Sequence, residues 1–179
     1  MDTAEFLKQY AAGRRDFQGV NLADSNLYRV GLREIKLNNA DLSGADLVGV
    51  DLVGANLQGA NLKGANLTAA NLHMACLIGA NLTAAGLWQA NLSGANLQRA
   101  KLDGADLSAA DLVGADLRET SLNQANLSSA NLIASNLESA DLTAANLTFS
   151  NLWKANVSQA ILTNATLPDG SHSETSFEF

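Results

Sequence analysis

A large apolar residue recurs at every fifth position of this chain, from Phe17 to Leu167, without a break in register. These central positions number 31, and leucine fills 29 of them. The residue two places before each centre is small, most often Ala, and the residue directly before it is usually Asn or Asp. A fixed short period over almost the whole chain indicates a solenoid, in which every repeat adds the same structural unit.

The five-residue period excludes both an amphipathic helix and a long flat strand. Five residues rotate an α-helix by about 500°, so successive leucines would not form a stripe. An odd period also places alternate leucines on opposite faces of a continuous strand. Within one repeat, however, Ala55 and Leu57 share a face, and Gln58 and Gly59 follow as a corner that suits glycine at positive φ. The chain is therefore predicted to turn every five residues and to coil around its leucines.

The repeats resemble those of a known family. Residues 55–64 read ANLQG and then ANLKG, which is similar to the A(D/N)LxG pattern of pentapeptide-repeat proteins. The resemblance covers residues 15–168 and implies an all-β fold, a right-handed quadrilateral parallel β-helix with four repeats in each of about eight coils. Residues 10–17 and 167–170 further resemble cyanobacterial members. The central residues are expected to fill the interior, among them Phe17, Leu57, Leu92 and Leu132.

Residues 1–14 are predicted to cap the N-terminal end, because a solenoid exposes its core and its strand edges at both ends. A helix is expected over residues 3–12, with Asp2 as its N-cap and Glu5 completing a capping box. One side of this helix is apolar and would seat on the first coil, through Phe6, Leu7 and Tyr10. The alternative role for this helix is to bind a partner.

The C-terminal end has no comparable helix. Residues 169–179 are polar and are expected to form a flexible tail. Either Phe177 and Phe179 fold back over the last coil, or two molecules stack end to end. The family resemblance implies that some members form a homodimer through their C-terminal coils, so a homodimer is one expected assembly.

Charge and composition limit the classes of partner and compartment. The net charge of −7 argues against direct nucleic-acid binding, which requires a basic face. No apolar run approaches the length of a membrane span, and no signal peptide is visible. Cys76 is the only cysteine, which excludes intrachain disulfides and fits a reducing compartment. We expect a cytoplasmic protein that binds neither membrane nor nucleic acid.

One outward column of side chains is the candidate interaction site. In a coil of twenty residues, positions twenty apart stack on one face, and Val113, Ile133 and Trp153 then form consecutive apolar members of one column. We call these three residues the apolar stripe; Phe149 lies beside it. Contiguous apolar and aromatic side chains mark interfaces. Two alternatives remain: such residues also suit ordinary strand surfaces, and Phe149 and Trp153 would equally serve a dimer.

The acidic residues support a second hypothesis. Some pentapeptide-repeat proteins mimic DNA in shape and charge and bind type II topoisomerases such as gyrase. That mechanism requires carboxylates along the rod, whereas Asp41, Asp46 and Asp51 follow one another around a coil. DNA mimicry is therefore the first alternative function, and a passive structural spacer is the other.

Catalysis is not expected. A leucine-filled interior leaves no cleft in which to bind a substrate or shift a pKa. His73 and Cys76 form a His-x-x-Cys spacing, but a structural metal site needs about four ligands and no second pair is present. The sequence predicts no catalytic, cofactor-binding or metal-binding residue and no cofactor. It favours a protein-binding, scaffolding or regulatory module with an unidentified protein partner.

Overall fold

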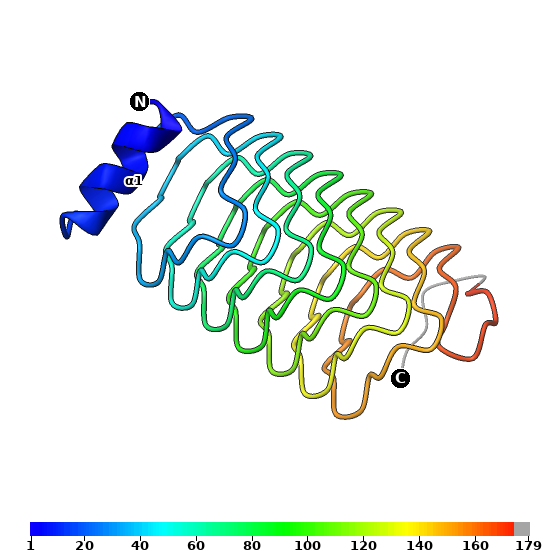
Figure 1. Ribbon diagram of the computed structural model, residues 1–179. Coiled ribbons are helices and arrows are strands. Elements are labelled where there is room, and N and C mark those ends of the chain that lie inside the picture. The colour runs from blue at the N-terminus through cyan, green and yellow to red at the C-terminus, as the bar shows by residue number, and fades with distance from the viewer. Residues whose placement is uncertain (174–179) are drawn as a thin grey trace.

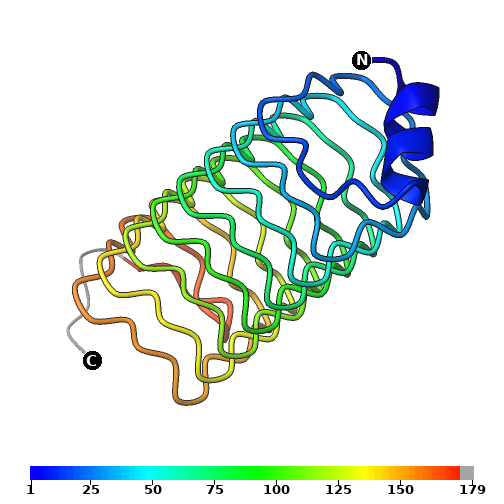
Figure 2. The ribbon, with the colours of Figure 1, turned by 90° about the vertical axis from the view of Figure 1, so that its left-hand side faces the viewer.

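The computed structural model describes residues 1–173 and shows a short helix followed by a rod of stacked coils (Figure 1). Helix α1 comprises Thr3–Ala11 and covers one end of the rod. The chain then advances coil by coil toward the opposite end, as the view along the other direction also shows (Figure 2). Phe177 and Phe179, which the sequence suggested as a cover for the last coil, lie outside the described residues.

Backbone hydrogen bonds between successive coils hold the rod together. Parallel bridges join Asp16 to Lys36 and recur every five residues up to the bridge between Asn146 and Thr166. In the repeats from Phe17 to Leu147 the central amide and the amide two residues later donate to the next coil. Leu57, for example, donates to the carbonyl of Cys76 at 2.7 Å. Because bridged residues are twenty positions apart and each repeat has five residues, four repeats form one coil, as predicted.

Every corner has the same backbone conformation. The amide of Ala60 donates to the carbonyl of Leu57 at 3.0 Å, which closes a four-residue turn, and Gly59 at its third position has a φ of 66°. The corresponding residue has positive φ at every corner from Gly19 to Asn164. Twenty of these residues are not glycine. The coil geometry therefore imposes the left-handed conformation, and glycine only makes it easier to adopt.

The interior is filled as the sequence predicts. The central side chains from Phe17 to Leu147 are at most 1 % exposed, and Leu57, Leu92 and Leu132 are fully buried. The small residues two places before the centres are buried from Ile35 onward, apart from the half-buried Ala155. Apolar burial on this scale is the main stabilising contribution to the rod.

The Asn and Asp residues before the centres have a structural role that the sequence analysis did not identify. All 23 of them accept a hydrogen bond through Oδ1 from the backbone amide two residues later. Asn66, for example, accepts from the amide of Thr68 at 3.1 Å. This is an Asx turn, and it orients the residue that enters each corner.

Helix α1 closes the N-terminal end. Asp2 is its N-cap and accepts a hydrogen bond from the amide of Glu5 at 2.8 Å. The Glu5 carboxylate instead accepts from Gln9 Nε2 at 2.6 Å, one turn along the helix. Phe6 is fully buried, and Leu7 and Tyr10 pack partly buried against the core. The helix ends at Ala11, one residue before the predicted boundary, and its C-cap is Ala12.

The last coil is followed by a short return strand. His172 forms an antiparallel bridge with Thr166, and Ser173 exchanges backbone hydrogen bonds with Asn164 and Ala165. The described part of the predicted tail is therefore bonded to the rod, because these residues find backbone partners that the end of the stack leaves open. Within residues 1–173, no helix has the length and hydropathy needed to cross a membrane.

Candidate interaction surfaces

The three members of the apolar stripe lie on successive coils, as predicted. Gly114 donates to the carbonyl of Ile133 at 2.9 Å, and Ala134 donates to the carbonyl of Trp153 at 2.9 Å. These bonds place Val113, Ile133 and Trp153 one above another on a single face. Val113 and Ile133 are half-buried, whereas Trp153 is 62 % exposed. The corner residues beside Val113 and Ile133 are the small Gly114 and Ala134, whereas Lys154 stands beside Trp153.

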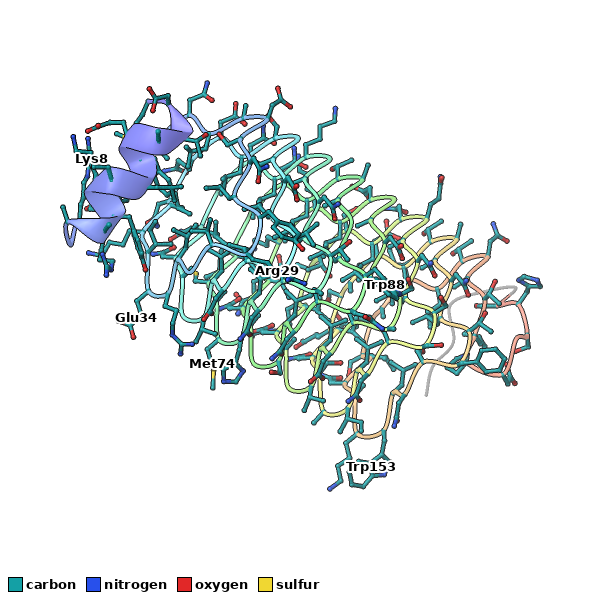
Figure 3. The ribbon with its side chains drawn as sticks, viewed as in Figure 1. Lys8, Arg29, Glu34, Met74, Trp88 and Trp153 are labelled. Atoms are coloured by element: carbon teal, nitrogen blue, oxygen red, sulfur yellow. The ribbon has the colours of Figure 1, made fainter. Side chains whose placement is uncertain are left out.

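The stripe ends at Trp153, and Phe149 lies beside it; both aromatic side chains are strongly exposed. The Lys154 Nζ lies 4.2 Å from the centre of the Trp153 ring, a cation–π contact that leaves the indole largely in solvent. Phe149 is 79 % exposed and has a φ of 61°. The other corner residues share this conformation, so the large exposed ring, and not the backbone, distinguishes Phe149. In Figure 3, Trp153 points away from the same long edge as Glu34 and Met74.

Other exposed aromatic residues are isolated from the stripe. Tyr28 and Trp88 lie on the neighbouring face, three coils apart, with Ser and Thr among the residues around them. The guanidinium of Arg29 lies 5.1 Å from the centre of the Tyr28 ring. By contrast, three of the seven exposed large apolar side chains of the described residues fall in a single coil, Phe149, Trp153 and Ile161. Exposed apolar surface thus concentrates near the C-terminal end.

At that end the interior is open. A cavity of about 470 Å³ penetrates the last two coils, and its walls are almost entirely aliphatic. Its lining residues are Leu137, Leu142, Leu147, Leu152, Ala155, Val157, Leu162, Leu167, Pro168 and Asp169. The sequence predicted an end without a covering helix, but the repeat pattern alone does not show how far the core opens, because the central leucines of the last coil occupy the same positions as all the others.

The rim of the cavity is an unpaired strand edge. Within the described residues, five amides that would donate to a following coil have no acceptor, those of Leu152, Lys154, Val157, Gln159 and Leu162. Three carbonyls that would accept from a following coil have no donor, those of Ser150, Ala155 and Ala160. Ser150 also has a buried hydroxyl without a hydrogen-bond partner. These groups lie on three sides of the coil, and the return strand at residues 171–173 covers the fourth.

The acidic residues are arranged in belts, as predicted from the sequence. Asp41, Asp46 and Asp51 lie on consecutive sides of the rod, and each makes the Asx bond that Asn makes elsewhere. Because Asn and Asp present the same acceptor, the fold does not require carboxylates at these places. Farther along, the Arg118 guanidinium lowers the pKa of Asp116, which it contacts at 2.7 Å.

His73 and Cys76 do not form a reactive pair. The Nδ1 atom of His73 lies 2.9 Å from the Ser93 hydroxyl, and that hydroxyl donates its one proton to Asn91 Oδ1 at 2.6 Å. His73 must therefore donate to Ser93, so it is not placed to activate the hydroxyl as a nucleophile. Cys76 is half-buried on the next side of the coil. No group of three or more His, Cys, Asp or Glu in residues 1–173 is placed to hold a metal ion.

The parallel coils, the leucine interior and the apolar stripe together define a β-helical solenoid. The family described as pentapeptide repeats matches in eight copies over residues 16–52, 45–83, 75–112, 110–148 and 140–169. The chain belongs to the pentapeptide-repeat family, and membership implies the right-handed β-helix that the sequence predicted.

Solved structures of several family members are similar to the chain. HetL, a pentapeptide repeat protein involved in heterocyst differentiation regulation from the cyanobacterium Nostoc, is 31% identical over 97% of this chain and 100% of its own, with a TM-score of 0.30. The Nostoc protein alr5209 is 43% identical over 64% of this chain and 80% of its own, with a TM-score of 0.31. QnrB1, a plasmid-mediated fluoroquinolone resistance protein, is 20% identical over 86% of this chain and 83% of its own, with a TM-score of 0.37. No curated protein matches significantly.

Proposed function

We propose that this pentapeptide-repeat rod is a non-catalytic, cytoplasmic module that binds a protein partner through the apolar stripe. The observation that carries the proposal is the exposure of Trp153 and Phe149 beside Ile133, on a rod whose other faces are mainly polar. Aromatic residues concentrate in interfaces because they bury a large area with few rotatable bonds. Phe149 is 79 % exposed, and this large apolar ring in solvent favours a role outside the fold.

A pull-down from the native host's lysate tests this function. The wild-type protein is compared with the folded double variant Ile133→Glu/Trp153→Glu, which places two carboxylates in the stripe. A protein retained by the wild type and lost by this variant supports the proposal. The matched control is Thr143→Glu/Thr163→Glu, which adds the same charge at the same height on the opposite face. Equal loss from both variants would assign the effect to charge and not to the stripe.

A homodimer through the C-terminal coils is a second assembly that a specific observation favours. Phe149 and Trp153 are strongly exposed near the C-terminal end, and contact between two rods there would bury both rings. Sedimentation at high micromolar concentration tests it: a dimer would support self-association, and a monomer would exclude it in that range.

DNA mimicry directed at gyrase is the alternative function. Asp41 and Asp46 stand where Asn would satisfy the same backbone bond, so the fold does not need their charge, whereas Asp51 pairs with Arg33 at 3.0 Å. A supercoiling assay separates the two functions, because a DNA mimic alters gyrase activity in the absence of any other protein. The passive-spacer alternative predicts no change of phenotype in the Ile133→Glu/Trp153→Glu variant. It also predicts none when the charges of Asp41, Asp46 and Asp51 are removed.

A further inference from the structure

The open end of the rod is distinct from the stripe in what it offers a ligand. Its amides at Leu152 and Lys154 and its carbonyl at Ser150 have no partners in the described chain. Ser150 is buried and Leu152 is half-buried, and backbone groups in such positions are nearly always paired. A ligand that satisfies them must both accept and donate hydrogen bonds at the spacing of an extended backbone. That requirement selects a peptide strand and excludes a purely hydrophobic small molecule.

We propose that the edge formed by residues 150–162 binds an extended segment of a partner protein as one further β-layer. The preceding coil defines the register. There Leu132 donates to the carbonyl of Asn151, and Ala134 donates to the carbonyl of Trp153. A segment in the equivalent place accepts from Leu152 and from Lys154, and the residue between its two acceptors points into the cavity.

This register specifies the size, polarity and charge of the side chains that the bound segment should have. Its middle residue is large and aliphatic, because it enters a cavity lined by Leu147, Leu152 and Val157. Its next residue is apolar, because it continues the column above Trp153. Its charge is close to zero: the described residues from 150 onward carry one cation, Lys154, and one anion, Asp169. An uncharged strand thus complements the end of an otherwise acidic rod.

A second copy of the chain fits this edge less well than a single strand. The return strand at residues 171–173 already forms the next layer on one side, through the bonds of Ser173 and the bridge between His172 and Thr166. The end is therefore stepped, and two such ends cannot meet evenly across all four sides. Each copy also carries a net charge of −7, so two rods repel each other. A strand needs only the three free sides.

Amide hydrogen exchange, resolved by NMR in the full chain, tests the proposal with a defined probe. The probe is a neutral synthetic peptide with the sequence of residues 128–136, SSANLIASN, which is this rod's own layer one coil earlier. Exchange at Leu152 and Lys154 should slow by about tenfold when the peptide is present at roughly ten times its Kd. Leu112, whose amide is already paired, should not change. The control peptide has aspartate in place of the central leucine and should have no effect.

Three results would overturn the proposal. The first is unchanged exchange at Leu152 and Lys154 with millimolar probe. The second is slow exchange in the protein alone at every concentration, which would show that the chain's own residues cover the edge. The third is slow exchange that appears only as protein concentration rises, which would assign the edge to a second copy. None of these outcomes depends on whether the apolar stripe binds a protein partner.

Discussion

The ring of Phe6 meets the ring of Phe17 edge-on, with centroids 4.6 Å apart and an angle of 64° between the ring planes. Phe17 is the first central residue of the rod, and Phe6 is the buried residue of α1. The guanidinium of Arg14 lies 4.6 Å from the centre of the Phe17 ring. Tyr10 fixes the other side of the helix by donating from its hydroxyl to the carbonyl of Arg33 at 3.2 Å. These contacts make α1 a lid over the first coil.

Replacement of the lid's anchor should destabilise the whole rod. Phe6→Ala removes a fully buried ring and opens the N-terminal core, so we expect the free energy of unfolding to fall by about 3–5 kcal/mol. Urea denaturation followed by circular dichroism measures this. Lys8→Ala, on the exposed side of the same helix (Figure 3), should change the value by about 0.5 kcal/mol or less. Equal stability of Phe6→Ala and wild type would show that α1 is not a lid.

A charge in the middle of the core should prevent folding. Leu92→Arg places a guanidinium at a fully buried centre, with no carboxylate to pair it, and desolvation of the charge costs several kcal/mol. We expect an unfolded or aggregated protein by circular dichroism. Gln58→Arg, which adds the same side chain at an exposed position, should melt cooperatively near the wild-type temperature. A cooperative wild-type melt of Leu92→Arg would contradict the inward placement of the centres.

The regular features of the fold were predictable because each repeat carries the same local signal. The five-residue period placed Leu57, Leu92 and Leu132 inside, and the apolar side of residues 3–12 placed Phe6 against the first coil. The stripe followed from the twenty-residue coil, since positions twenty apart must stack. These inferences needed only periodicity and the geometry of an extended backbone.

The open end was not predictable in the same way. Leu152 and Leu132 occupy the same central position of their repeats and both follow an Asn, yet of the two only Leu152 lines the cavity, because no complete coil covers it within the described residues. The return strand was also missed: Ser171 to Ser173 have no apolar alternation, and their pairing depends on backbone groups left free by the last coil. Exposure of Phe149 at positive φ likewise comes from the corner geometry that the coil imposes.

The Asx bonds predict which substitutions the repeat tolerates before its centres. Asn66→Ala removes the acceptor of the Thr68 amide and should lower the free energy of unfolding by about 0.5–1.5 kcal/mol. Asn66→Asp keeps the same oxygen and should be nearly neutral at pH 7. Thermal unfolding of the pair measures the difference. If both variants lose the same stability, the amide nitrogen of Asn66 and not its Oδ1 would carry the effect.

The corner conformation predicts opposite effects of exchanging alanine and glycine. Gly104 has a φ of 64° and open space around its missing Cβ, so Gly104→Ala adds only backbone strain and should cost about 1 kcal/mol. Ala84 has a φ of 55°, so Ala84→Gly relieves strain and should raise the urea midpoint despite the entropy of glycine. A lower midpoint for Ala84→Gly would mean that this entropy outweighs the strain at the corners.

Paired carboxylates predict how stability depends on pH. The hydroxyl and amide of Ser43 lower the pKa of Asp41, and the Arg118 guanidinium lowers the pKa of Asp116. A carboxyl whose pKa is lower in the folded state stabilises the fold above its unfolded pKa, near 3.9, and this contribution is lost as pH falls through the folded pKa. The melting temperature should therefore be level between about pH 7 and 5 and fall below about pH 4.

The matched variant for this pH dependence is Asp116→Asn. Asparagine keeps the oxygen that accepts from the Arg118 amide but has no charge to pair with the guanidinium. Its melting temperature should therefore fall less steeply between pH 4 and pH 2 than that of the wild type, because one proton-linked group has been removed. Differential scanning calorimetry across this range measures the slope. A wild-type melting temperature that rises on acidification would mean that relief of the net charge of −7 outweighs the loss of these pairs.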